Sequence, residues 1–131
     1  MSLDALALGA HPDDVELGCG GTLAGLVESG RSVGILHLTS GEAGTRGDAE
    51  TRRAEARAAA SILGAELHLL DCGDGALRTG RDEEDSLIRK LRETRPRLVL
   101  APAPQDRHPD HARAFRLVRD ACFYAGLAER S

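Results

Sequence analysis

The sequence predicts an α/β protein built on a doubly wound, mainly parallel sheet with helices on both faces. Short apolar runs alternate along the 131 residues with longer amphipathic stretches, an arrangement typical of βαβ units. Gly30, Gly64 and Pro96 stand where three of the amphipathic stretches end. Because parallel strands are joined by right-handed crossovers, few topologies remain, and we expect the strand order 3-2-1-4.

The two helices predicted in the first half of the chain have recognisable boundaries. Apolar residues recur near helical spacing over Glu16–Glu28, and Gly30 provides a stop. Thr51–Leu63 is rich in Ala, Arg and Glu, and Asp48 can cap its N-terminus. The strands predicted around these helices are the apolar runs Leu3–Gly9, Ser32–Thr39 and Ala65–Leu70.

The second half repeats the alternation once and then ends. Asp82–Thr94 has acidic residues at its start and leucines on one face, and Pro96 breaks it. Arg97–Pro102 is the fourth predicted strand, and the last helix is expected from about Asp110 to Ala125. Sheets of this class usually contain five or more strands, so either the sheet is small or further strands belong after Ser131.

Composition favours one globular domain over residues 1–131 and excludes several classes of protein. Apolar residues make up 41% and charged residues 29%, and the net charge is −4. A basic block is lacking and stacking aromatics are scarce, which argues against nucleic-acid binding. Neither a membrane span nor a signal peptide is recognisable, so we expect a cytoplasmic protein. The three cysteines form no CxxC motif, which makes a disulfide framework or a zinc–cysteine knuckle improbable.

Two clusters of His and Asp carry the candidate chemistry. Ala10–Asp14 (AHPDD) directly follows the first predicted strand, and Arg107–His111 (RHPDH) follows the fourth. In the order 3-2-1-4 these strands are neighbours, and the strand order reverses between them. Their carboxyl ends therefore open a crevice, which is the usual ligand site of such sheets. Each cluster alone is also compatible with a capped helix start, but both together predict one shared site.

The residue types in these clusters favour a hydrolytic metal centre. His11, Asp14 and His111 supply two imidazoles and one carboxylate, which with an open water position is the layout of a catalytic zinc site. An ion held in this way activates water for hydrolysis. Asp13 is placed to act as the general base. His108 is expected to stabilise an oxyanion or to protonate a leaving amine.

Further residues near the two clusters are assigned supporting roles. Asp110 is expected to orient one of the metal-binding histidines. Arg107 can bind a carboxylate in a bidentate manner, whereas Arg113 is expected on a solvated helix face. His37 and His68 lie within strands and are interpreted as structural. The Gly-rich loop Ser40–Gly47 and the start of the next helix add three candidate substrate-binding residues: Glu42, Arg46 and Arg53.

The quoted motifs resemble those of the LmbE-like (PIG-L) zinc-dependent N-acetylglucosaminide deacetylases. The likeness rests on AHPDD, on TSGEAGTRG with the following RAEA at Arg53–Ala56, and on the stretch Gln105–His111. TRG and RHPDH are most similar to the bacillithiol-biosynthesis branch. In the mycothiol branch a Tyr stands two residues before the first His of HPDH, where this chain has Asp106.

The resemblance implies a Rossmann-like fold, one zinc per chain and a specific set of roles. It implies His11, Asp14 and His111 as zinc ligands, Asp13 as general base and His108 as electrophile or acid. It also implies a small amino-sugar substrate and, for the bacillithiol-like branch, a homo-hexamer. Members of the family are usually longer, so the resemblance predicts that residues 1–131 lack the C-terminal part of the domain.

Three functional hypotheses follow, of which deacetylation of an N-acetylglucosamine conjugate is preferred. The second is another metal-assisted hydrolysis, such as phosphoester cleavage, for which Asp13, His108 and Asp110 would help to hold a second ion about 3.5–4 Å from the first. The third is a metal-stabilised module without catalysis. The arginines at 46, 53 and 107 suggest an anionic group, such as a carboxylate, on the substrate.

Overall fold

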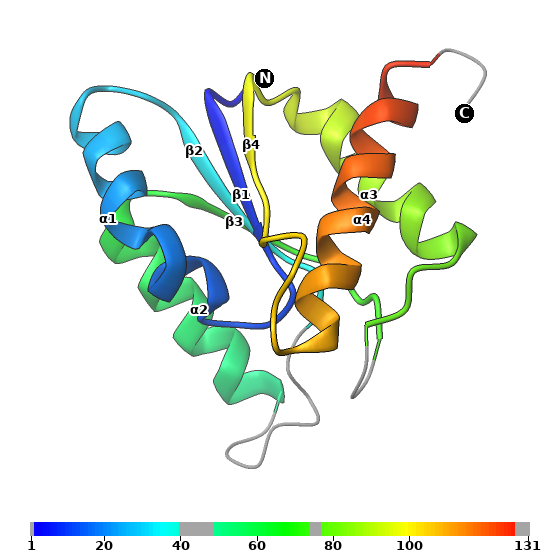
Figure 1. Ribbon diagram of the computed structural model, residues 1–131. Coiled ribbons are helices and arrows are strands. Elements are labelled where there is room, and N and C mark those ends of the chain that lie inside the picture. Colours follow the sequence, from blue (N-terminus) through cyan, green and yellow to red (C-terminus); the bar gives the residue numbers. More distant parts are fainter. Residues whose placement is uncertain (1, 40–48, 74–76, 128–131) are drawn as a thin grey trace.

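A four-stranded, all-parallel sheet in the order β3-β2-β1-β4 forms the centre of the protein, which confirms the predicted topology. The computed structural model describes residues 2–39, 49–73 and 77–127. Strands and helices alternate along the chain (Figure 1). In chain order the elements are β1 (Ala5–Gly9), α1 (Asp14–Glu28), β2 (Val33–His37), α2 (Ala49–Leu63), β3 (Glu66–Leu69), α3 (Arg81–Thr94), β4 (Leu98–Leu100) and α4 (Pro109–Ala125).

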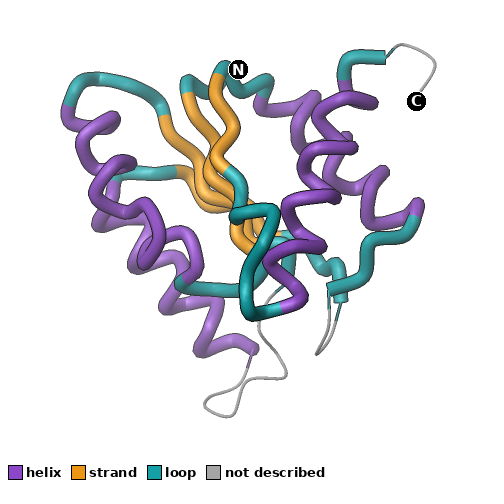
Figure 2. The backbone as a smooth tube through the Cα atoms, in the orientation of Figure 1, coloured by secondary structure: helices purple, strands orange, loops and turns teal. Residues whose placement is uncertain are grey.

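The helices form two layers, with α1 and α2 on one face of the sheet and α3 and α4 on the other (Figures 1 and 2). All five residues of β1 are buried, as expected for a strand covered on both faces. Ala5 and Ala7 belong to the apolar cluster under α1 and α2. Leu6 and Leu8 belong to the cluster under α3 and α4. The small side chains on the first face allow α1 to lie close to the strand.

The register brings the carboxyl ends of β1, β2 and β4 to the same edge of the sheet. Gly9 at the end of β1 pairs with His37 of β2, and Ala7 pairs with Leu100 of β4. The chain leaves β1 through the AHPDD segment and leaves β4 through the RHPDH segment. Both predicted clusters therefore lie at the edge where the strand order reverses between β1 and β4.

Helix α1 differs most from the expectation. It begins at Asp14 instead of Glu16, and Cys19 interrupts it with φ −145° and ψ 19°. Glycines on both sides of Cys19 weaken the helical preference at this point, because glycine costs about 1 kcal/mol relative to alanine in a helix. The other element boundaries lie within two residues of the predicted ones. The proposed cap Asp48 lies outside the described residues.

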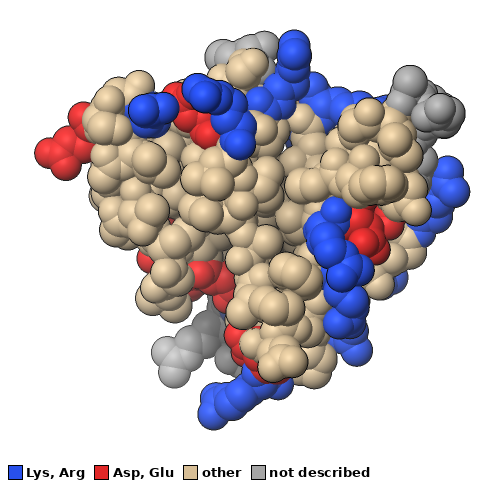
Figure 3. Space-filling view, turned by 45° about the horizontal axis from the view of Figure 1, so that its top comes forward, with Lys and Arg blue, Asp and Glu red and all other residues tan. Residues whose placement is uncertain are grey.

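Among the described residues, no helix is both long enough and apolar enough to cross a bilayer. In Figure 3, Lys and Arg form separate groups with uncharged surface and acidic side chains between them. The edge strand β4 is more open than β1, with Leu98 47% exposed. Beside it, a groove of about 570 Å³ runs between α1 and the segment after β4, and Asp14, Asp106 and His111 line one part of it.

Candidate metal centre

The first half of the site is a tight turn between β1 and α1. Gly9 suits the close packing here, because a Cβ at this position would approach the side chains of Asp14 and Val15 to 3.0 Å and they would have to shift. Asp13 adopts a left-handed conformation with φ 76°, which Asp tolerates better than most residues. The Oδ2 atom of Asp14 accepts a hydrogen bond of 2.9 Å from the backbone N–H of His11. The turn therefore holds the His11 and Asp14 side chains together.

The second half is the start of α4, which follows the loop after β4. His108 is the N-cap residue, and its Nδ1 accepts a 3.1 Å hydrogen bond from the backbone N–H of Asp110. Pro109 occupies the first helical turn, where its missing N–H costs nothing. The Oδ1 atom of Asp106 accepts a 3.1 Å hydrogen bond from the backbone N–H of His108. These hydrogen bonds fix the backbone at the start of α4, and with it the directions of the His108 and His111 side chains.

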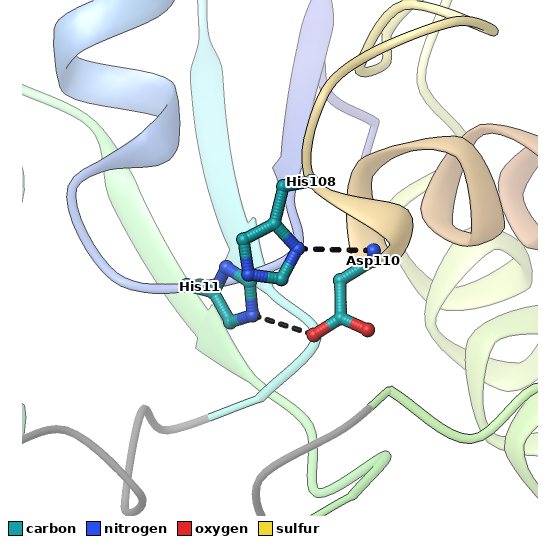
Figure 4. Close-up of side chains that lie close together, drawn as sticks. All are labelled: His11, His108 and Asp110. Atoms are coloured by element: carbon teal, nitrogen blue, oxygen red, sulfur yellow. Dashed lines mark hydrogen bonds and ion pairs between the residues drawn. The ribbon is translucent and has the colours of Figure 1, made fainter.

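The fold brings these two segments into direct contact. The Nε2 atom of His11 lies 2.8 Å from Oδ2 of Asp110, although 99 positions separate the two residues (Figure 4). The Oδ2 atom of Asp14 lies 3.2 Å from Nε2 of His111. The ring centroids of His11 and His108 are 4.8 Å apart, and those of His108 and His111 are 5.2 Å apart. Three imidazoles and two carboxylates thus share one small region.

The atoms of His11, Asp14 and His111 have the spacing of metal ligands. One ligand atom from each residue lies within 4.8 Å of the other two. The Oδ2 atom of Asp14 is 3.4 Å from Nδ1 of His11 and 3.2 Å from Nε2 of His111. Ligands of a tetrahedral zinc with bonds of about 2.0–2.2 Å lie about 3.3–3.6 Å apart. This donor set therefore fits a zinc ion.

A second group, formed by His11, His108 and Asp110, meets the same 4.8 Å criterion but fits a metal less well. Asp110 is only 2% exposed, and its Oδ1 already accepts hydrogen bonds from the backbone N–H of Leu77 and from Arg113. Its other oxygen is bonded to His11, and Nδ1 of His108 is also used. Asp110 is thus committed to protein donors, which leaves the group containing Asp14 as the better candidate.

In both His11 and His111, one ring nitrogen lies near Asp14 and the other contacts a second carboxylate. Nε2 of His11 contacts Asp110 at 2.8 Å, and Nδ1 of His111 contacts Oδ2 of Asp106 at 3.0 Å. An ionised carboxylate only accepts, so these nitrogens donate. In each neutral ring the lone pair then lies on the nitrogen that faces Asp14. Metal-binding histidines in proteins usually show this arrangement.

The pKa values of the buried groups reflect these contacts. For His11, a hydrogen bond to Asp14, which only the protonated ring can donate from Nδ1, raises the pKa above its ordinary value, although partial burial opposes this effect. Burial by itself would raise the pKa of Asp14, but hydrogen bonds from His11 and the nearby His111 outweigh it and the net shift is downward. Burial likewise opposes the shift at Asp110, where the Leu77 N–H, His11 and Arg113 together lower the pKa.

For three of the remaining predicted residues the structure gives a position, and two lie outside the described residues. Asp13 is exposed at the start of α1, next to Asp14, and Arg107 is exposed beside His108. Arg53 is partly buried in α2, on the opposite face of the sheet from α4. Glu42 and Arg46 lie outside the described residues. The roles of these residues remain predictions.

Arg113 extends one expectation. Its side chain is 43% exposed, as expected for a solvated helix face, but its Nη1 also lies 3.0 Å from Oδ1 of the buried Asp110. The reason is helical spacing, because residues three apart lie on the same side of α4. The sequence interpretation also gave no role to Asp106. Its signal was available, since an Asp two residues before a helix start commonly bonds the backbone there.

A buried pair lies behind the turn that carries Asp14. His37 is 1% exposed, and its Nε2 is 3.6 Å from Oε1 of Glu16. Within the part of the chain that the structure describes, neither ring nitrogen of His37 has a hydrogen-bond partner. Burial lowers the pKa of His37, against the opposing effect of Glu16.

Comparison with known proteins decides the family. Residues 6–122 match the family model PIG-L, described as GlcNAc-PI de-N-acetylase. The chain belongs to the PIG-L family. The match confirms the resemblance inferred from the HPDD and HPDH motifs, and it includes every residue of the candidate centre.

Several relatives of this PIG-L chain are named as deacetylases, and at least one is named as a hydratase. Diacetylchitobiose deacetylase of Thermococcus kodakarensis is 38% identical, over 93% of this chain and 50% of that protein. The conserved protein TT1542 of Thermus thermophilus is 46% identical with a TM-score of 0.92, over 98% of this chain and 59% of that one. The hydratase GalB of Pseudomonas putida is 31% identical with a TM-score of 0.87, over 97% and 58%. The PIG-L chain thus spans between 50% and 59% of the length of these relatives.

Proposed function

We propose that this PIG-L chain provides the metal-binding residues of a zinc-dependent hydrolase that removes the acetyl group from an N-acetylglucosamine conjugate. The observation that carries the proposal is the meeting of His11, Asp14 and His111 at ligand spacing, on segments nearly a hundred residues apart. The relatives support the choice of reaction, because one is named for deacetylation of diacetylchitobiose and another for deacetylation of a 2-acetamido-2-deoxyglucopyranoside of inositol.

In the proposed reaction, the metal ion and the side chains of the protein would have separate roles. A zinc ion on these three residues would lower the pKa of water to about 7 and polarise a carbonyl group. Asp13 is proposed as the base that takes a proton from the attacking water, because it is exposed and adjacent to the ligand Asp14. A two-ion phosphoesterase is a weaker alternative, since Asp110, which it would need for the second ion, is committed to Leu77, Arg113 and His11.

His108 is proposed as the group that stabilises the oxyanion. Its Nδ1 accepts the Asp110 N–H, so the proton of a neutral His108 ring is on Nε2. The ring is exposed and lies against His11. A neutral imidazole held in this way donates a hydrogen bond from Nε2 to a carbonyl oxygen that becomes negative during attack. Protonation of the leaving amine by His108 would first require the contact with Asp110 to break.

The nature of the substrate beyond the amino sugar is also proposed. Arg107 stands next to His108 on the exposed loop, and guanidinium groups bind carboxylates in a bidentate manner. A carboxylate on the group attached to the sugar, as in bacillithiol-type thiol biosynthesis, would suit this position. Faster hydrolysis of a carboxylate-bearing N-acetylglucosaminide than of a neutral one would support this choice, and equal rates would remove it.

A second candidate reaction is the addition of water to an activated double bond, because a hydratase from the same fold is 31% identical to this chain. The two reactions differ in their product. We expect the zinc-loaded protein to release acetate from N,N′-diacetylchitobiose or N-acetylglucosamine and to lose this activity with a chelator. Hydration of an unsaturated tricarboxylate, such as the 4-carboxy-2-hydroxymuconate for which GalB is named, without any acetate release would favour the hydratase and contradict the deacetylase.

A further inference from the structure

Asp106 makes two contacts that tie together both ends of the HPDH segment. Its Oδ1 accepts a 3.1 Å hydrogen bond from the backbone N–H of His108, and its Oδ2 lies 3.0 Å from Nδ1 of His111. The carboxyl group is 36% exposed and lies in the loop between β4 and α4. It borders the same groove as Asp14 and His111.

The contact with His111 selects one tautomer of that ring. An ionised carboxylate has no proton to donate, so Nδ1 of His111 must be the donor. A neutral His111 then has its lone pair on Nε2, the atom that lies 3.2 Å from Asp14. Only an unprotonated nitrogen binds a metal ion. The contact with Asp106 thus favours the metal-binding tautomer of His111 even in the metal-free protein.

We propose that Asp106 is a positioning residue of the metal centre, which holds His111 in its metal-binding tautomer and fixes it relative to His108. The proposal rests on the proposed metal-dependent function, because it assigns to Asp106 the role for His111 that Asp110 has for His11. Carboxylates on the outer nitrogen of a ligating imidazole contribute about 10- to 100-fold to metal affinity or activity.

The substitution Asp106→Asn is the sharpest test. An amide has one accepting and one donating atom, whereas the carboxylate accepts at both positions. The backbone N–H of His108 can only donate, so it keeps the amide oxygen. The amide N–H2 then faces Nδ1 of His111, and this contact is kept only if the ring proton moves to Nε2. The proton would then occupy the atom that should bind the metal.

The experiment measures zinc affinity and the tautomer of His111 in the same proteins. Zinc dissociation constants are obtained by competition with a chromophoric chelator for wild type, Asp106→Asn, Asp106→Ala and Asp120→Asn. Asp120 is a matched control, because it is 42% exposed and pairs with Arg119 on α4. Long-range ¹H–¹⁵N spectra of the metal-free proteins, recorded at pH 8, report which ring nitrogen of His111 carries the proton.

We expect Asp106→Asn to weaken zinc binding about 10- to 100-fold and to move the His111 proton from Nδ1 to Nε2. Asp106→Ala should also weaken binding, by no more than the Asn variant, and Asp120→Asn should bind zinc as wild type does. Wild-type affinity in Asp106→Asn, or a proton on Nε2 already in wild type, would overturn the role of Asp106. A wild-type protein that binds no zinc would instead overturn the metal centre itself.

Discussion

The segments after β1 and after β4 both contribute an imidazole to the candidate centre, but the protein holds the two rings in different ways. The outer nitrogen of His11 meets Asp110, which is 2% exposed and comes from the other segment. The outer nitrogen of His111 meets Asp106, which is 36% exposed and comes from the same loop and helix start. One ring is therefore oriented by the tertiary fold and the other by a local turn.

One metal centre can therefore combine a ligand held by the core, His11, with a ligand held by a surface loop, His111. Asp110 cannot move without breaking its bond to the Leu77 N–H, so His11 is fixed as long as the core is intact. Asp106 is exposed, and so is the backbone N–H of His108 that it accepts, so loss of Asp106 costs little folding stability because water can replace it there. We therefore expect substitutions around His11 to affect folding, and substitutions around His111 to affect mainly metal binding.

The largest expected effect concerns catalysis, where the first segment is predicted to supply the base as well as two ligands. Asp13→Ala should reduce kcat for acetate release by about 10²- to 10⁴-fold, as for other general bases. Zinc content should remain at the wild-type level, because Asp13 is not among the proposed ligands. Steady-state kinetics with metal analysis provides the measurement. A full rate at normal zinc content would disprove the assignment of Asp13.

Asp110 and Asp106 are expected to contribute differently to the unfolding free energy of the metal-free protein. Asp110→Ala leaves the buried N–H of Leu77 without its acceptor, which should cost about 1–3 kcal/mol. Asp106→Ala should change the free energy of unfolding by no more than about 0.5 kcal/mol, as is usual for exposed sites. Urea unfolding in the presence of a chelator measures both. Equal losses in the two variants would remove the distinction between a rigid and a local half.

Acid sensitivity gives a smaller effect with a defined sign. Burial alone would raise the pKa of Asp110, but hydrogen bonds from the Leu77 N–H, His11 and Arg113 outweigh it, so the pKa is lower in the folded protein than in the unfolded chain. The contribution of Asp110 to stability is therefore present above the unfolded pKa of about 3.9 and is lost as the pH falls through the folded value.

The difference in unfolding free energy between wild type and Asp110→Asn should accordingly shrink as the pH is lowered below about 4. Urea unfolding at a series of pH values, with chelator present throughout, follows this difference. A difference that stays constant, or grows, down to the acid limit of the folded protein would show that the Asp110 contacts do not favour the charged form.

The sequence was sufficient to predict the strand order and the place where the two clusters meet. Alternating apolar runs define β1 to β4, and the reversal of order between β1 and β4 brings HPDD and HPDH to one edge. These features depend on periodicity and on chain topology, which are visible in the residues themselves. The family assignment, confirmed over residues 6–122, depended on the same two motifs together with TSGEAGTRG and the RAEA that follows it.

The finer contacts of the site were not predictable in the same way. The bond from the Leu77 N–H to Asp110 joins residues 33 positions apart and depends on the path of a loop. The glycines on both sides of Cys19 weaken the helical preference, but the residue at which α1 breaks follows only from coordinates. The Asp-x-His spacing of Asp106 and His108 could have suggested the bond to the backbone N–H of His108. The contact of Asp106 with His111, five positions later, follows only from coordinates.

The central claim is that one ion is held jointly by the segments after β1 and β4. Elemental analysis of the purified wild type and of three single variants, His11→Ala, His111→Ala and His108→Ala, tests it most directly. We predict about one zinc per chain in wild type and in His108→Ala, and loss of the zinc in both other variants. Retention of zinc in His111→Ala together with its loss in His108→Ala would contradict the claim and move the ion to His11, His108 and Asp110.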